Sequence, residues 1–228
     1  DLPDQEIVFL IGLREPMPRT LAEFEDARHN VSARRARPIP PKPHRSPPRL
    51  PRLKLTFTGY IMQLFHDWDT VGGEGWILLP RSRITDGSLV DMSLYYYQFR
   101  RFLAAGFSPS QFVVYPSRIY FADRDSPDKS DVLKAVRAKL GPDVLRLQRN
   151  VTIAQKGFDE RHGSNISLGT LPFGLHKRLL REVFGPANRK LMKLLAKEVG
   201  NGMTLVGYTG EVGDVAAVTS WMTSGWSF

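Results

Sequence analysis

The chain has 228 residues, a net charge of +9 and a hydrophobic content of 42%, as expected for a globular protein with one substantial domain and an appendage. Cysteine is absent, which excludes disulfides, zinc–thiolate sites and thiol catalysis. No window approaches the roughly 18 consecutive apolar residues of a transmembrane helix, so we expect no membrane partner.

Residues 1–33 form an acidic N-terminal segment with seven acids and three bases. A strand-like run, Ile7–Leu13, comes first, and a helix is predicted over residues 20–30. Thr20 suits the N-cap of that helix, and Glu23, three residues later, completes a capping box. The segment is too short to bury much surface by itself, so we expect it to dock on a neighbouring part of the chain.

Residues 34–54 form a basic, proline-rich arm with eight bases and no acid. Seven of the fourteen residues from Pro38 to Pro51 are proline, which disfavours helix and strand and predicts an extended, polyproline-like chain. The arm has no aromatic side chain, so it can hold phosphates but cannot stack on bases. We predict that it binds the phosphate backbone of RNA through its eight basic side chains: Arg34, Arg35, Arg37, Lys42, Arg45, Arg49, Arg52 and Lys54.

Two other interpretations of the arm stay open. It could be a solvated linker, or a proline-rich ligand for an aromatic groove of the SH3 kind. No acid lies between Arg28 and His66, whereas an indifferent linker would be expected to carry some Asp or Glu. The charge pattern therefore favours a polyanion as the partner.

Residues 55–228 are predicted to form a β-rich domain. Leu53, Leu55 and Phe57 alternate with polar residues, which is the period of a half-buried strand. Further strands are predicted from apolar runs separated by Gly- and Pro-containing turns: Tyr60–Phe65, Trp76–Leu79, Leu94–Leu103, Gln111–Phe121, Val151–Ala154, Met203–Tyr208 and Val215–Trp226, the last two as a hairpin around Gly210–Gly213. The expected fold is mainly β, an antiparallel jelly-roll-like sandwich with inserted helices and an extended basic N-terminal arm.

The inserted helices are predicted at Lys129–Leu140, Leu175–Phe184 and Arg189–Val199, from apolar residues at helical spacing. The polar side of the last two carries seven bases: Lys177, Arg178, Arg181, Arg189, Lys190, Lys193 and Lys197. We interpret this side first as a solvated face. A second nucleic-acid contact or a subunit contact is the alternative.

Three features, in order, resemble the coat proteins of small icosahedral RNA viruses. The first is the basic arm at 34–54. The second is the stretch 86–102, in which Leu94–Phe102 looks like a Tyr-rich entry to a central strand. The third, Ile119–Ser130, resembles a strand that runs into an Asp-rich loop. Two departures are the acidic segment before the arm and the long helical stretch 172–199.

The resemblance implies a structural capsid protein, which would self-associate into a large icosahedral homo-oligomer and neutralise packaged RNA with its arm. Its expected location is the virion and the host cytoplasm. Two other functions stay open. One is a ribosomal or organellar ribonucleoprotein component that binds structural RNA, and the other is an enzyme on a β scaffold.

Few residues suggest chemistry. Asp123, Asp125 and Asp128 could bind calcium, but Arg124 and Lys129 lie among them, so a helix-capping loop is favoured. The sequence His66–Asp69 offers an imidazole and two carboxylates, yet the other histidines show no ligand spacing. No phosphate-binding loop, dinucleotide fingerprint or Gly-x-Ser-x-Gly elbow is present. We therefore predict no enzyme, no cofactor and no metal site.

Overall fold

The computed structural model describes residues 7–35, 56–72, 90, 93–117, 127–140 and 171–224, with the side chains of 26–35, 71 and 127–130 excepted. The chain divides into two compact units. Unit 1 comprises residues 1–15, 95–165 and 187–228, and unit 2 comprises 16–94 and 166–186. Both units therefore contain residues from the acidic segment and from the predicted β-rich domain.

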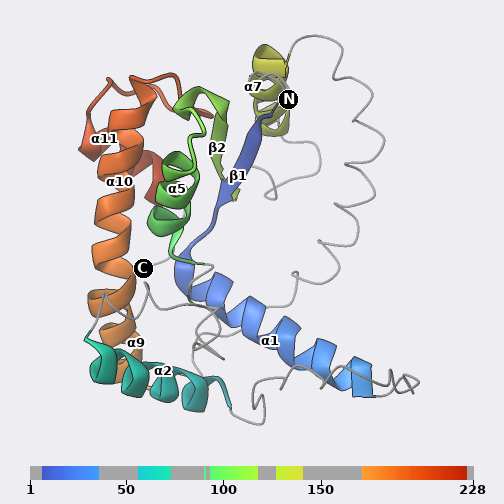
Figure 1. Cartoon of the computed structure of the whole chain (residues 1–228), viewed down its shortest axis with the longest axis vertical. Coiled ribbons are helices and arrows are strands. Elements are labelled where there is room, and N and C mark those ends of the chain that lie inside the picture. Colours follow the sequence, from blue (N-terminus) through green and yellow to red (C-terminus); the bar gives the residue numbers. More distant parts are fainter. Residues whose placement is uncertain are drawn as a thin grey trace. The chain divides into compact units, whose positions relative to one another are not determined.

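The described part of unit 1 contains a three-stranded parallel sheet with the strand order β1-β2-β3 (Figure 1). The strands are β1 (Phe9–Leu13), β2 (Phe112–Pro116) and β3 (Thr204–Leu205). Phe9 lies opposite Phe112, and Val113 lies opposite Thr204. Parallel strands need long connections, which is why the partners come from three distant parts of the sequence.

Helices cover both faces of this sheet. One face buries Leu13, Phe112 and Leu205 in a core cluster with three helices, α5 (Tyr95–Ala104), α10 (Gly185–Val199) and α11 (Val215–Thr223). The other face packs Val113 and Val206 against Val132 of α7 (Pro127–Leu140). Successive residues of a strand point to opposite faces, so β2, the central strand, is buried along its whole length.

Helices α5 and α10 each lead into a strand through a glycine turn. Gly106 follows α5 and Gly202 follows α10, with φ angles of +94° and +91°. Only glycine adopts this region at little cost. The turn after α5 continues into the short 3-10 helix η1 (Pro109–Gln111), which Ser108 caps.

The described part of unit 2 consists of α1 (Pro16–Arg35), α2 (Phe57–Val71), α9 (Phe173–Arg178) and the π-helical turn η4 (Leu179–Phe184). Phe24 of α1 packs against Phe57 and Tyr60 of α2, with ring centroids 5.3 and 5.6 Å away. The π-helical turn stands directly before Pro186, whose missing N–H and bulky ring are incompatible with an α-helical bond to residue 182. The N–H of Gly185 accordingly bonds to the carbonyl of Leu180, five residues back.

The predicted fold class is wrong. The described residues are mostly helical, and their three strands are parallel and form an open sheet, so they form no antiparallel jelly roll. Three predicted strands are helices: Tyr60–Phe65 lies in α2, Leu94–Leu103 largely in α5, and Val215–Trp226 largely in α11. The hairpin around Gly210–Gly213 is wrong for the same reason.

Other predictions are confirmed. A strand lies within Ile7–Leu13, a second within Gln111–Phe121, and helices cover Lys129–Leu140 and the stretch 175–199. The strand at Met203–Tyr208 shrinks to the two residues of β3. The runs at Trp76–Leu79 and Val151–Ala154, with Leu53 and Leu55, lie outside the described residues. Phe57, predicted to end the strand with Leu53 and Leu55, begins α2 instead.

The helix at 20–30 exists, but its predicted start is wrong. Helix α1 begins at Pro16. Proline is tolerated at the first helical position because the N–H that it lacks would have no partner within the helix. Thr20 is fully buried inside the helix, and its hydroxyl donates to the carbonyl of Pro16 at 2.8 Å. No helix among the described residues is long and apolar enough to cross a membrane.

Candidate nucleic-acid interface

Helix α10 of unit 1 separates apolar and basic side chains cleanly. Leu191 and Leu195 are buried in the sheet-facing core. The opposite side presents four bases, defined here as the α10 basic face: Arg189, Lys190, Lys193 and Lys197. Spacings of three and four residues place these side chains in one stripe along the helix.

Helix α10 itself offers its basic face a single carboxylate. This carboxylate belongs to Glu198, which is 6% exposed and accepts a hydrogen bond from Asn201 at 2.7 Å. The Lys197 ammonium lies 3.7 Å from that carboxylate, while its side chain stays 75% exposed. Arg189 and Lys193 are exposed and form no ion pair with a described residue. At Arg189 and Lys193 a polyanion would therefore meet cations whose charge is still available.

Helix α5 lies beside α10 in the same core cluster and adds to the positive charge (Figure 1). The Lys190 ammonium stands 5.9 Å from the ring centroid of Tyr96 on α5. Arg100 and Arg101 of α5 are exposed, and the helix contains no acid. Two adjacent helices of unit 1 thus carry six bases against one buried acid.

Two of the eight basic residues of the predicted arm lie within the described part of the chain. Arg34 and Arg35 form the end of α1, so the arm is not extended at its first two residues. The other six predicted phosphate ligands lie outside the described residues: Arg37, Lys42, Arg45, Arg49, Arg52 and Lys54. Binding of RNA by all eight stays a prediction.

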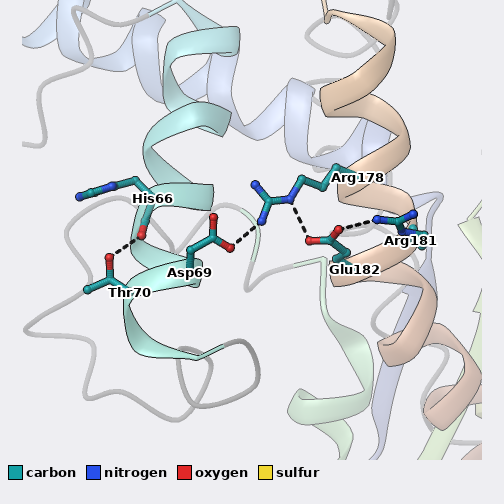
Figure 2. Close-up of polar contacts among 6 residues, drawn as sticks. All are labelled: His66, Asp69, Thr70, Arg178, Arg181 and Glu182. Atoms are coloured by element: carbon teal, nitrogen blue, oxygen red, sulfur yellow. Dashed lines mark hydrogen bonds and ion pairs between the residues drawn. The ribbon is translucent and has the colours of Figure 1, made fainter.

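The basic stretch in unit 2 differs from the α10 basic face, because its arginines are paired with acids (Figure 2). Arg178 bonds to Asp69 of α2 at 2.5 Å and to Glu182 at 2.8 Å, and it lies over the Phe65 ring at 4.2 Å. Arg181 bonds to the other carboxylate oxygen of Glu182 at 2.8 Å. These contacts raise the pKa of Arg178, the Glu182 bond contributing most, and they lower the pKa of Glu182. The network connects helices of unit 2 and engages Arg178 and Arg181 with carboxylates, while Lys177 is exposed.

The imidazole and carboxylates of His66–Asp69 do not converge. Figure 2 shows the His66 ring pointing away from Asp69, whose carboxylate reaches Arg178. Asp67 accepts a hydrogen bond from Gln63 at 3.0 Å. No group of three or more His, Cys, Asp or Glu suitable for a metal occurs in the described ranges. Asp123 and Asp125 of the calcium alternative fall outside those ranges.

Comparison of the chain with protein-family models, curated proteins and solved structures finds no match. The functional argument therefore depends on the residues of this chain alone.

Because the sequence predicts a strand over 94–103, it does not identify Tyr96, Arg100 and Arg101 as candidate site residues. A pattern that identifies the helix was present in the sequence, since Tyr95, Phe99 and Phe102 follow the i, i+4, i+7 spacing of a helix face. Recognising that face would have left Tyr96 and Arg100 on an adjoining side, next to a second helix rich in lysine.

Proposed function

We propose that this protein binds RNA through the phosphate backbone, using the α10 basic face together with the basic arm 34–54. The observation that carries the proposal is the stripe of cations on α10, three of them exposed, with the only acid of the helix buried beneath them. Lysine and arginine on one side of a helix form the electrostatic footprint expected of a nucleic-acid surface.

The location of the charge excess supports the same proposal. The arm contributes eight positive charges and no negative ones, and α5 with α10 contributes six positive charges. In unit 2, by contrast, Arg178 and Arg181 are engaged by carboxylates. Cations that bind phosphate release counterions from RNA, so binding should weaken steeply with salt.

The proposed function shares its RNA ligand with the coat-protein hypothesis but does not include a jelly-roll shell. The Tyr-rich stretch 94–102, which carried part of that resemblance, lies largely in α5. The alternative hypothesis, a ribonucleoprotein component, needs no shell fold. RNA binding is the property that the coat-protein and ribonucleoprotein hypotheses share. Self-association into a large homo-oligomer stays a separate prediction.

The test is RNA binding by the full chain and by the double variant Arg189→Gln/Lys193→Gln, followed by fluorescence anisotropy over a range of salt concentrations. Both side chains are exposed on the side of α10 opposite the core, so the fold should tolerate glutamine. We expect the variant to bind RNA about tenfold more weakly at low salt. The log–log salt slope should fall by roughly one to two units.

A matched control removes two charges from α7, which covers the other face of the sheet. Lys134→Gln/Arg137→Gln lowers the net charge equally, but Lys134 already pairs with Asp131 at 2.9 Å. We expect its RNA affinity to stay within about twofold of wild type. Equal losses in the two variants would show that only net charge matters and would overturn the α10 assignment, and a wild-type chain that binds no RNA would overturn the proposed function.

A further inference from the structure

Tyr96 is held at the edge of the α10 basic face. Its half-buried ring packs against the core cluster of unit 1. The neighbouring Tyr97 ring contacts it edge-on, with centroids 5.1 Å apart and an interplanar angle of 78°. The Lys190 ammonium lies 5.9 Å from the centroid of the Tyr96 ring. The ring is thus an oriented aromatic surface bordered by positive charge.

Proteins that bind single-stranded nucleic acid combine an aromatic ring with a row of cations in this way. The cations follow the backbone, and the ring stacks on an unpaired base whatever its identity, because every base has a π-face. The lysine stem is flexible, so the Lys190 ammonium can move from the ring to a phosphate when a base arrives. The arm between 34 and 54 has no aromatic residue and can supply only the phosphate contacts.

We propose that the surface formed by Tyr96 and the α10 basic face binds single-stranded RNA, with one unpaired base stacked on the Tyr96 ring and the flanking phosphates on Lys190 and Lys193. This inference rests on the proposed RNA binding and specifies its substrate class. Base identity is not read, since stacking and phosphate contacts carry no hydrogen-bond code.

A duplex fits this surface less well. In A-form RNA the bases are stacked inside the helix, and the major groove is too deep and narrow for side chains to read. A base would have to leave the duplex before it could reach Tyr96, at a cost of a few kcal/mol. A duplex can still meet the cations of α10 through its phosphates, so we expect it to bind without using Tyr96.

The experiment compares two RNAs of equal length, a uridine oligomer and a blunt duplex of about 12 nucleotides, by fluorescence anisotropy on the full chain. Tyr96→Leu retains an apolar side chain for the core but removes the ring. We expect it to raise the Kd of the single strand by roughly 5- to 100-fold. The Kd of the duplex should stay within about twofold of wild type, because duplex binding uses the cations alone. Tyr96→Phe retains the ring and should bind the single strand like wild type.

A measurement on the wild-type chain avoids any folding defect in the variants. Ultraviolet crosslinking to a single strand that contains 5-iodouridine should attach RNA to the peptide that carries Tyr96, as mapped by mass spectrometry. Wild-type binding to both RNAs with no crosslink at Tyr96 and no effect of Tyr96→Leu would overturn the stacking inference alone. Failure of the wild-type chain to bind either RNA would overturn the proposed function as well.

Discussion

Lys139, near the end of α7, joins the two turns that precede β2 and β3. Its ammonium donates to the carbonyl of Ser110 and, at 3.0 Å, to the carbonyl of Gly202. Burial lowers the pKa of this lysine. The side chain therefore fixes the starts of two neighbouring strands with one cation.

We expect Lys139→Met to lower the free energy of unfolding by about 1–2 kcal/mol, because two carbonyls lose a charged donor while the aliphatic packing is retained. Urea denaturation of the full chain measures the change. Lys134→Met, on the exposed side of the same helix, should change it by less than about 0.5 kcal/mol. Equal effects of the two substitutions would show that Lys139 does not hold the strand starts.

Glu182 gives unit 2 a pH dependence. Hydrogen bonds from Arg181, which contributes most, and from Arg178 lower the pKa of Glu182 below its ordinary value of 4.5. The folded state therefore favours the ionised carboxylate. Its stabilisation is fully present at pH values above the unfolded pKa and is lost as the pH falls through the lower, folded pKa.

We expect Glu182→Gln to destabilise the protein at pH 7 by at most about 1 kcal/mol, since the pair is partly exposed and screened by solvent. The difference from wild type should shrink as the pH falls below 4.5 and the carboxylate becomes protonated. Thermal unfolding of both chains at several pH values measures it. A difference that grows in acid would contradict the assigned direction of the pKa shift.

At the level of the helices, several apolar runs of the sequence predict strands where the structure has helices. Helix α2 buries Phe57, Ile61 and Trp68, whose spacing of four and seven residues is helical. The run Tyr60–Phe65 includes several of the buried residues but is too short to show the helical period. Its aromatic and β-branched residues suggest a strand. Tertiary packing on one face decided the structure against local propensity.

The strand pairing itself was not predictable from local pattern. The sequence correctly placed strands near Ile7 and Gln111, but β1, β2 and β3 pair across roughly a hundred residues at a time. Nothing within either strand specifies a distant parallel partner. In the candidate interface, the bases of α10 were visible in the sequence, whereas their nearness to Tyr96 depends on the packing of α5 against α10.

The arm allows a prediction that is independent of the α10 basic face. Replacing Arg34, Arg35 and Arg37 with glutamine should weaken binding equally for RNAs of different sequence, because phosphate contacts carry no base information. The log–log salt slope should fall by about two to three units. Anisotropy titrations with two unrelated sequences measure both effects. Unchanged binding would show that these three arginines do not contact RNA.

At the scale of the whole molecule, residues 7–33 of the acidic segment are part of the folded structure. As expected, its strand docks on a neighbour, because β1 pairs with β2. Leu13, Met17 and Phe24 are each 1% exposed. Truncation of this segment would therefore remove core packing together with negative charge.

The net charge of +9 also bears on self-association. Like charges keep copies of the chain apart, and RNA that neutralises them removes this repulsion. At low salt we therefore expect the protein to form large homo-oligomers only with RNA present, with a mass that grows with RNA length. Size-exclusion chromatography with light scattering measures the mass of the particles, with and without an RNA of about 40 nucleotides. The measurement is made at low salt and at about 0.5 M salt, where charges are strongly screened. Uniform particles whose mass is independent of RNA length would instead favour the closed shell of a coat protein, and oligomers that form without RNA at low salt would contradict the role given to charge.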